Sequence, residues 1–302
     1  MGDKASEGVA VIGSGGIGGY LAGSLAEAGH DVTLCVRTPI DSLTIESGGV
    51  SRRAPVRIVS DPAKAKPARW ILLATKAQDT AGAAAWVEAM GGSGSVLAVV
   101  QNGIGHLERA APIAYGSEVL PAIIWCSVER ARPGHIVHHG AQRMAVPAGA
   151  AGEAFARLFE RTGFMVEEAD DFTTVAWGKL VSNLVANAVT ALTIRRTGVF
   201  EVPQVGALAR RILAEAVTVA QAEGAKLTGA DADKAYAGLG RHGPDAGTSM
   251  LYDRLAGRPL EHRYLTGALV KAADRHGIDA PVNRTLYALL EAVSGQKLQE
   301  VA

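Results

Sequence analysis

The stretch VAVIGSGGIGGY, residues 9–20, decides the fold of the first part of this chain. A short apolar run ends at glycines, and three of these, Gly13, Gly15 and Gly18, form a G-x-G-x-x-G array. In such an array the first glycine permits a tight turn and the second lets a pyrophosphate approach the backbone. The third lets helix and strand pack closely. N–H groups at the start of the following helix then bind the anion.

We therefore predict a dinucleotide-binding loop, in which Ser14, Gly16 and Ile17 fill the positions between the three glycines. The alternative is an ordinary glycine-rich turn, since the chain has 36 glycines among 302 residues. The dinucleotide interpretation is favoured because the loop follows an apolar strand and opens a helix, and the motif requires both.

Strand and helix patterns alternate on both sides of this loop. Residues 31–36, 43–59, 70–75, 96–100, 119–125 and 135–138 have strand character, and residues 20–28, 81–90 and 151–161 have helical character. Such alternation predicts a mainly parallel sheet with helices on both faces. From about residue 171 helical periodicity replaces it, at 171–193, 203–222, 230–239, 249–255, 264–276 and 283–294. The sequence thus predicts an α/β N-terminal Rossmann-type domain over residues 1–170 and an all-α C-terminal domain over 171–302.

The end of the second strand bears on the choice of dinucleotide. NAD-binding folds usually place Asp or Glu there, to accept a hydrogen bond from the ribose 2′-hydroxyl. Here the strand DVTLCV is followed by Arg37 and Thr38. An arginine suits a 2′-phosphate, so NADP(H) is the predicted cofactor, although a solvated surface arginine would look the same in sequence.

Two further polar residues follow apolar strands. Lys76 comes after WILLAT, and Asn102 comes after VLAVVQ. The carboxyl ends of strands in an open sheet face the ligand crevice, so both residues are candidates for the cofactor site. Either could instead be an ordinary polar loop residue.

A polar stripe runs along the apolar segment AWGKLVSNLVANAVTAL. Lys179, Asn183 and Asn187 are spaced i, i+4 and i+8, which places them on one face of a helix. Polar groups on a helix that is otherwise Leu, Val and Ala need partners, so we interpret the stripe as the lining of a pocket. A solvent-exposed stripe is the alternative. A lysine in such a pocket can act as a general acid toward a ketone oxygen as hydride reaches the carbon.

Composition excludes several classes of function. Thirty basic residues balance thirty acidic ones, which gives no general attraction to nucleic acid. Cys35 and Cys126 lie in apolar runs without metal-ligand spacing, and we predict two buried thiols in a reducing compartment. His135, His138 and His139 are clustered without a companion carboxylate motif, which indicates a surface strand. We predict no metal site.

Membrane insertion is not expected either. The N-terminal MGDKASEG lacks a charged segment followed by an apolar one, so no secretory signal is predicted. The stretch from Leu180 to Ile194 is interpreted as too short and too polar to span a bilayer. These features predict a soluble cytoplasmic protein.

Taken in order, the motifs resemble those of the ketopantoate reductase (2-dehydropantoate 2-reductase) family over essentially the whole chain. The matching pieces are GSGGIG at 13–18, Arg37, the TK pair at 75–76, QNGIG at 101–105, the W-x-K-x-x-x-N-x-x-x-N stretch at 177–187, SM at 249–250 with Asp253, Glu261, and APVN at 280–283 after HGI. The lysine–asparagine stripe followed by SM and Glu is the most specific part of the match.

The resemblance implies an NADPH-dependent reduction of a 2-oxo acid, ketopantoate to pantoate, at an active site between the two domains. It makes Lys179 the general acid and lets Asn183 and Asn187 contact substrate, while Ser249 helps to hold the substrate carboxylate. Asn102 would touch both cofactor and substrate, and Glu261 would lie near Lys179, where substrate and nicotinamide ribose meet. Residues Gly13 to Gly18, Arg37 and Lys76 would bind NADP.

Some positions depart from the family pattern. Ala246 stands where the family often has Asn, and Thr197 stands at another family asparagine. The E-x-D-x-x-N-G pattern reads Glu261, Arg263, Thr266 and Gly267 here. A reductase of the same family acting on a different ketone or 2-oxo acid in specialised metabolism therefore stays open, as does a non-catalytic NADP-binding sensor. The expected binding partner is a small-molecule 2-oxo acid substrate. The sequence does not determine the oligomeric state, and a homodimer is one of the alternatives.

Overall fold

The computed structural model describes residues 8–241 and 243–296, so most of the N-terminal segment considered for a secretory signal lies outside the described residues. The chain divides into two compact units. Unit 1 contains Met1–Gln101 and Gly105–Phe172, and unit 2 contains Asn102–Ile104 and Thr173–Ala302. Each unit has a hydrophobic core of its own and is described by itself.

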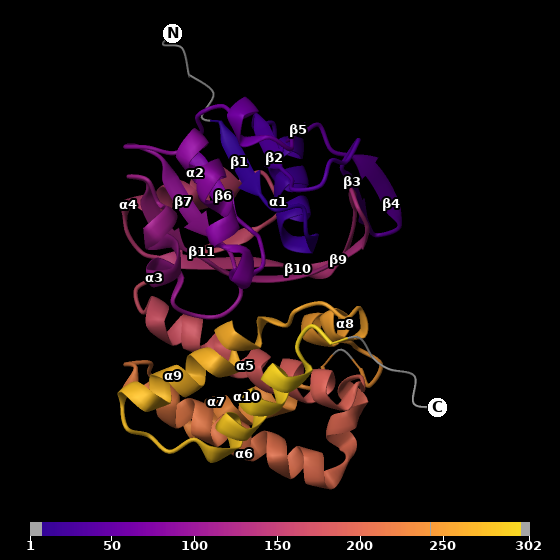
Figure 1. The fold of residues 1–302 in the computed structure, drawn as a ribbon, viewed down its shortest axis with the longest axis vertical. Coiled ribbons are helices and arrows are strands. Elements are labelled where there is room, and N and C mark those ends of the chain that lie inside the picture. Colours follow the sequence, from indigo (N-terminus) through magenta and orange to yellow (C-terminus); the bar gives the residue numbers. More distant parts are fainter. Residues whose placement is uncertain (1–7, 242, 297–302) are drawn as a thin grey trace. The chain divides into compact units, whose positions relative to one another are not determined.

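A six-stranded sheet forms the centre of unit 1 (Figure 1). Its strands are β1 (Val9–Ile12), β2 (Val32–Cys35), β5 (Arg57–Val59), β6 (Trp70–Leu73), β7 (Val96–Val99) and β8 (Glu118–Pro121). Every neighbouring pair is parallel, in the order β5-β2-β1-β6-β7-β8. Since the chain visits β1, β2 and β5 before β6, β7 and β8, the strand order reverses between β1 and β6. This is the arrangement of a Rossmann-type domain, whose ligand crevice opens at that point.

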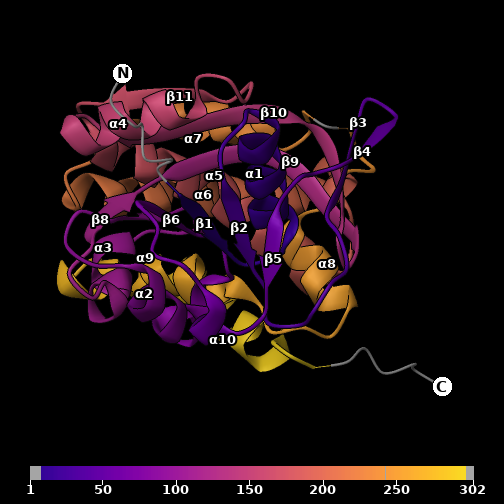
Figure 2. The ribbon, with the colours of Figure 1, turned by 90° about the horizontal axis from the view of Figure 1, so that it is seen from above.

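A second sheet packs in the same unit. It contains β3 (Thr44–Ser47), β4 (Val50–Arg53), β9 (Ile123–Arg132), β10 (His135–Pro147) and β11 (Met165–Ala169). Helix α1 (Gly16–Glu27) lies between the two sheets, as Figure 2 shows, and its buried residues share one core with both. Helix α2 (Ala84–Met90) covers the opposite face of the parallel sheet. The remaining helices of unit 1 are α3 (His106–Ala110) and α4 (Ala150–Phe159).

Helices are the only regular secondary structure among the described residues of unit 2. Its α-helices are α5 (Phe172–Thr193), α6 (Pro203–Ala222), α7 (Gly229–Gly238), α8 (Ser249–Leu255), α9 (Thr266–Arg275) and α10 (Pro281–Val293). Short 3₁₀ turns η5 (Thr197–Glu201) and η6 (Glu261–Tyr264) connect them. The predicted fold class, an α/β domain followed by an all-α domain, is thus confirmed.

Helix α5 forms the core of unit 2. It runs for 22 residues and begins well before Leu180, so the prediction that this apolar stretch is too short to span a bilayer is wrong on length. By length and composition alone α5 could cross a membrane, with a hydropathy of 1.2 over an 18-residue window. However, 61% of that window is buried inside the protein, as is typical of a core helix.

Other local expectations differ from the structure. The strand predicted over 119–125 is two strands, β8 and β9, which belong to different sheets. β10 is 13 residues long where only 135–138 was expected, and β11 was not predicted. α1 begins at Gly16 although its first turn is mostly glycine, because the loop before it fixes the start of the helix.

The cysteine and histidine interpretations are only partly right. Cys35 is a buried thiol, and burial raises its pKa to about 12, whereas Cys126 is partly exposed. His139 is exposed, but His138 is half-buried and its ring stacks on Tyr20, with ring centroids 4.4 Å apart.

Candidate active site

The glycine loop follows β1 and leads into α1. Gly13 has a φ of +113°, and an added Cβ would stand 3.0 Å from the backbone of Ala74 and Thr75. At Gly18 an added Cβ would lie 2.0 Å from the Gly13 carbonyl oxygen. Both positions therefore require glycine, the first for its turn and its close neighbour, the second for the packing of helix against loop.

Gly15 has different surroundings. It is the residue before α1, with φ −70° and ψ −176°, a conformation that any residue can adopt. Apart from Gly15, its chain neighbours and the backbone of its own helix, no heavy atom of the described residues lies within 4 Å of the position of a Cβ at Gly15. The first turn of α1, from Gly16 to Gly19, carries no charged side chain. Open space beside helix N–H groups fits a pyrophosphate, so this loop has the shape that a dinucleotide needs.

Lys76 belongs to the same end of the sheet. The β6 strand ends at Leu73, and residues 74 and 75 then pack against Gly13, which places Lys76 beside the glycine loop. The backbone that leads into Lys76 therefore lies against the loop at the reversal point between β1 and β6, where an open α/β sheet binds its ligand.

Arg37 follows β2 and is exposed, directly after the buried Val36. Within the described residues its side chain makes no hydrogen bond or ion pair, so its guanidinium remains available for a phosphate. Contact of Arg37 with a cofactor stays a prediction.

Gln101 is a residue that the sequence reasoning did not single out, although it begins the QNGIG motif. It is 4% exposed, and its side chain joins the ends of β6 and β7. Its Nε2 donates to Thr75 Oγ1 at 3.0 Å, and its Oε1 accepts from Arg109 Nε at 3.0 Å. A glutamine directly after a buried strand was the only available signal.

The polar stripe lies on one face of α5, because residues 179, 183 and 187 all fall within this continuous helix. Lys179 and Asn183 are half-buried, while Asn187 is 7% exposed. The Asn187 amide is held by three hydrogen bonds: its Oδ1 accepts from Ser249 Oγ at 3.2 Å and Met250 N at 3.1 Å, and its Nδ2 donates to the Asn183 carbonyl at 2.9 Å.

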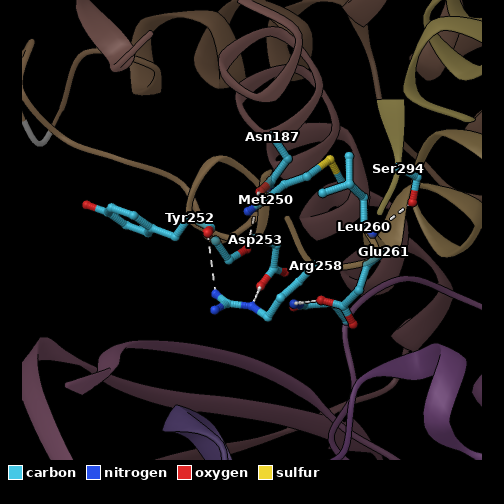
Figure 3. A network of polar contacts seen from close by, with 10 residues as sticks. Asn187, Met250, Tyr252, Asp253, Arg258, Leu260, Glu261 and Ser294 are labelled. Atoms are coloured by element: carbon cyan, nitrogen blue, oxygen red, sulfur yellow. Dashed lines mark hydrogen bonds and ion pairs between the residues drawn. The ribbon is translucent and has the colours of Figure 1, made fainter. Parts of the chain in front are cut away.

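These bonds give Asn187 a definite local function. Its side-chain oxygen accepts from Met250 N and so holds the start of α8 (Figure 3). The same oxygen accepts the hydroxyl hydrogen of the exposed Ser249. About one turn further along α5, the Thr190 hydroxyl lies 2.7 Å from the hydroxyl of Thr248, the residue before α8. This is a second hydrogen bond between α5 and the start of α8. The predicted substrate contact of Asn187 would therefore act at least partly through Ser249.

Asn102 and Glu261 are brought together within unit 2. Asn102 Nδ2 donates to Glu261 Oε2 at 3.5 Å, at the long limit of a hydrogen bond, and Glu261 is 4% exposed. Next to them Gly103 has a φ of +91°, and a Cβ there would stand 2.2 Å from the Tyr264 carbonyl oxygen. Glycine at 103 thus lets the QNGIG segment lie against η6, which carries Glu261.

Two further contacts fix the approach to Glu261, and the sequence reasoning missed both. Arg258 turns back to α8, where its Nε donates to Asp253 Oδ1 at 2.9 Å (Figure 3). Leu260 N donates to Ser294 Oγ at 3.0 Å. The segment between Ser249 and Glu261 is therefore held at both ends, since Asp253 belongs to the helix that begins with Ser249.

The residues that depart from the family pattern fall into two groups. Thr197 and Ala246 are in contact: the Thr197 hydroxyl donates to the Gly243 carbonyl at 2.6 Å, and Thr197 N donates to the Ala246 carbonyl at 3.0 Å. The threonine hydroxyl is thus used to hold the loop before α8.

The second group lies after Glu261. The Arg263 guanidinium bonds to the Glu291 carboxylate, and this bond, with that from His262, lowers the pKa of Glu291 to about 2. Thr266 is 1% exposed, and its hydroxyl has no hydrogen-bond partner among the described residues.

The APVN motif has a structural explanation outside the site. Glu215 of α6 accepts hydrogen bonds from Val282 N and Asn283 N, both at 3.0 Å, and so caps the start of α10. Within the described part of the chain, no group of three or more His, Cys, Asp and Glu residues could hold a metal ion.

Comparisons with known proteins identify the family of this chain. The family model described as "Ketopantoate reductase PanE/ApbA" matches residues 9–151, and its C-terminal counterpart matches residues 171–294. A relative from Mycobacterium tuberculosis named 2-dehydropantoate 2-reductase is 38% identical, and the match covers 95% of this chain and 98% of the relative. One of the same name from Caulobacter vibrioides is 35% identical over 95% of this chain and 99% of its own length.

Solved structures show the same fold. A PanE/ApbA family ketopantoate reductase from Ralstonia eutropha JMP134 superimposes with a TM-score of 0.88 at 31% identity, covering 95% of this chain and 98% of that one. A D-mandelate dehydrogenase solved with NADH and anilino(oxo)acetate reaches a TM-score of 0.86 at 18% identity, which is a likeness of fold alone. Both family models and the full-length relatives lead to one conclusion: this chain belongs to the ketopantoate reductase family.

Proposed function

We propose that this chain is an NADPH-dependent reductase that converts 2-dehydropantoate (ketopantoate) to pantoate. The observation that carries the proposal is the polar face of α5, where Lys179 and Asn183 share a helix face with Asn187, which holds Ser249. Family membership and the Rossmann-type fold imply a nicotinamide cofactor. The names of the full-length relatives support the substrate.

The cofactor assignment to NADP(H) rests on residues of unit 1. Gly13 to Gly18 would hold the pyrophosphate at the start of α1, and Lys76 would add a positive charge beside it. Arg37 would bind the 2′-phosphate, for which the end of β2 offers a cation in place of the carboxylate that NAD prefers. When bound, the reduced nicotinamide supplies a hydride to the carbonyl carbon.

Residues of unit 2 would act on the substrate. Ser249 would turn its single hydroxyl hydrogen from Asn187 Oδ1 to the substrate carboxylate, with Asn183 beside it. Lys179 would polarise the ketone and deliver a proton to its oxygen as negative charge develops there. Asn102 and Glu261, which lie in contact within unit 2, would orient substrate and nicotinamide ribose.

A second candidate is the same chemistry on a different ketone or 2-oxo acid. Thr197 and Ala246 favour it, because the Thr197 hydroxyl is bonded to the backbone and Ala246 has no polar group to offer a substrate. A non-catalytic NADP sensor is disfavoured, since it needs no proton donor and would have no reason to combine Lys179, Glu261 and Ser249.

One assay separates these candidates. Purified protein is mixed with NADPH and a panel of 2-oxo acids, and oxidation is followed by the loss of NADPH absorbance. Ketopantoate should give the highest kcat/KM. A higher value for another 2-oxo acid would select the second candidate. Tight NADPH binding without turnover of any member of the panel would select the sensor.

The proposed partners are a small 2-oxo acid and NADP(H), and the proposed location is the cytoplasm. A ketopantoate reductase from Staphylococcus aureus, described as dimeric, has this fold with a TM-score of 0.87 at 24% identity. Sedimentation of this chain over a range of concentrations decides between a monomer and a homodimer.

A further inference from the structure

The side chain of Gln101 connects two strand ends that the proposed cofactor site needs. Its Nε2 donates to Thr75 Oγ1 and Thr80 Oγ1, both at 3.0 Å, and reaches the Lys76 carbonyl at 3.4 Å. Its Oε1 accepts from Arg109 Nε at 3.0 Å. All of these residues belong to unit 1.

The direction of the Gln101 amide is fixed by its partners. The Arg109 guanidinium can only donate, so it must face the amide oxygen. The Lys76 carbonyl can only accept, so it must face the NH₂ group. Because the amide needs a donor on one side and an acceptor on the other, neither a carboxylate nor an apolar side chain reproduces both halves.

The segment that Gln101 holds is the wall of the glycine loop. Ala74 and Thr75 lie against Gly13, where an added Cβ would come within 3.0 Å of their backbone. Within the same segment Thr80 donates from its hydroxyl to the Ala77 carbonyl at 2.8 Å. Residues 74–80 are thus held in place between the loop on one side and Gln101 on the other.

The backbone of Gln101 is fixed as well. His106 Nε2 donates to the Gln101 carbonyl at 2.8 Å. Burial, with a smaller effect of the Arg109 charge, lowers the pKa of His106 to about 4, so the ring is neutral near pH 7 and can keep this bond with a single N–H. With 4% of its surface exposed, Gln101 has almost no area to offer a ligand directly.

We infer that Gln101 is a positioning residue for dinucleotide binding, which acts through Lys76 and the wall at Ala74 and Thr75. The inference rests on the proposed function, because it assumes that the glycine loop and Lys76 bind NADP(H). It assigns Gln101 no contact with the cofactor and no part in the chemical step.

A double-mutant cycle on NADPH affinity tests the inference. Gln101→Met keeps the length of the side chain and removes both halves of the amide contact. We expect it to weaken NADPH binding about tenfold, which is about 1.4 kcal/mol. In a Lys76→Ala background the same change should weaken binding less than about threefold, because only the wall at Ala74 and Thr75 then remains for it to act through. In an Arg37→Ala background the effect should again be about tenfold.

Hydrogen exchange of the protein without cofactor gives a second readout. In Gln101→Met the backbone amides of residues 75–80 should exchange faster, while those of α1 keep their protection. Equal loss of protection in both segments would show a general loss of stability and overturn the inference. Thr80→Val, which removes a single hydroxyl of the same network, repeats the comparison if Gln101→Met folds poorly.

The outcomes separate the inference from the proposed function. If the wild-type protein binds neither NADPH nor NADH, the proposed function fails and the inference fails with it. If the wild type binds NADPH tightly but Gln101→Met has the same effect in all three backgrounds, or none, only the inference is overturned.

Discussion

Gly15 and Gly18 belong to one loop but have opposite surroundings. Beyond its chain neighbours and the backbone of its own helix, a Cβ at Gly15 would meet no heavy atom of the described residues within 4 Å, whereas one at Gly18 would clash at 2.0 Å with the Gly13 carbonyl oxygen. Gly15→Ala should therefore fold normally and lose NADPH affinity, because the methyl group takes the space of the pyrophosphate. Gly18→Ala should lower the free energy of unfolding by at least about 1–3 kcal/mol.

Urea unfolding and NADPH titration of both variants check this pair. Each variant serves as the control of the other, since the two changes add the same methyl group three residues apart. A Gly15→Ala protein that binds NADPH as tightly as wild type would mean that the pyrophosphate lies elsewhere.

Lys179 is expected to matter for turnover and not for cofactor affinity. Its proposed interaction strengthens only as charge develops on the carbonyl oxygen, so its loss should lower kcat more than it raises KM. Lys179→Ala should lose about 10²–10⁴-fold in kcat and still bind NADPH, because the proposed phosphate contacts lie in unit 1. Steady-state kinetics and an NADPH titration on the folded variant measure both quantities. A near-normal kcat would mean that Lys179 takes no part in catalysis and that the polar residues of α5 are structural.

Residue-level prediction from sequence works best where spacing alone determines position. Lys179, Asn183 and Asn187 could be placed on one helix face because three residues at i, i+4 and i+8 have no other arrangement in a continuous helix. Gln101 could not be found, since Thr75 and Thr80 are 26 and 21 residues away in the sequence. Arg258 could not be found because it turns back to Asp253 from outside any helix, where spacing does not determine position. The amide of Gln101 is explained only when Thr75 and Arg109 are seen on either side of it.

At the scale of elements, the junction of β7 and α3 should respond to pH. His106 is fully buried, and burial, with the nearby Arg109 charge, lowers its pKa from 6.5 to about 4. The folded state thus favours the neutral ring. Its contribution to stability is complete above pH 6.5, declines as the pH falls, and is lost by about pH 4. By pH 5 the loss is on the order of 2 kcal/mol.

Urea unfolding at pH 7 and pH 5 tests this expectation. Wild type should lose more stability over this interval than His106→Gln, which keeps a donor and cannot titrate. His30→Asn, at a partly exposed loop position, is the matched control and should follow wild type. If wild type and His106→Gln lose the same amount, His106 does not titrate in this interval.

Helices and strands whose apolar residues recur at a regular spacing were predicted from the sequence. Strands that exist only because they pair with a distant segment were not. The helices of unit 2 and the strands of the parallel sheet have apolar patterns that burial dictates. β11 reads Met-Val-Glu-Glu-Ala and has little pattern; its pairing with β10 makes it a strand. The division of residues 118–132 into β8 and β9 depends on two different sheets, which a local reading cannot see.

For the molecule as a whole, the fold class could be predicted because the two parts of the chain build different cores. The core of unit 1 combines strands and helices, and that of unit 2 consists of helices. The second sheet escaped notice because it is assembled from three separate regions: β3 and β4 near residue 50, β9 and β10 between residues 123 and 147, and β11 after residue 164. Long-range pairing of this kind leaves no local period. Resemblance to a family supplied a prediction that periodicity could not, namely that Lys179, Ser249 and Glu261 belong to one site.

Cofactor choice should be visible in the stability of the whole chain. A ligand that binds only the folded state stabilises it by RT ln(1 + [L]/Kd), which is about 2.7 kcal/mol at a free concentration of 100 times Kd. Loss of one charge-assisted phosphate contact weakens binding about ten- to a hundredfold. At the same concentration NADH should then stabilise the protein by only about 0.4–1.4 kcal/mol.

Arg37 provides the control for this difference. It is exposed, so Arg37→Ala should leave the stability of the free protein within about 0.5 kcal/mol of wild type. In that variant the gain from NADPH should fall to the level given by NADH, because both cofactors then lack a partner for the 2′ position. Denaturant unfolding with each cofactor, for both proteins, measures all four values. If wild type gains equally from NADPH and NADH, the arginine at the end of β2 does not select the cofactor.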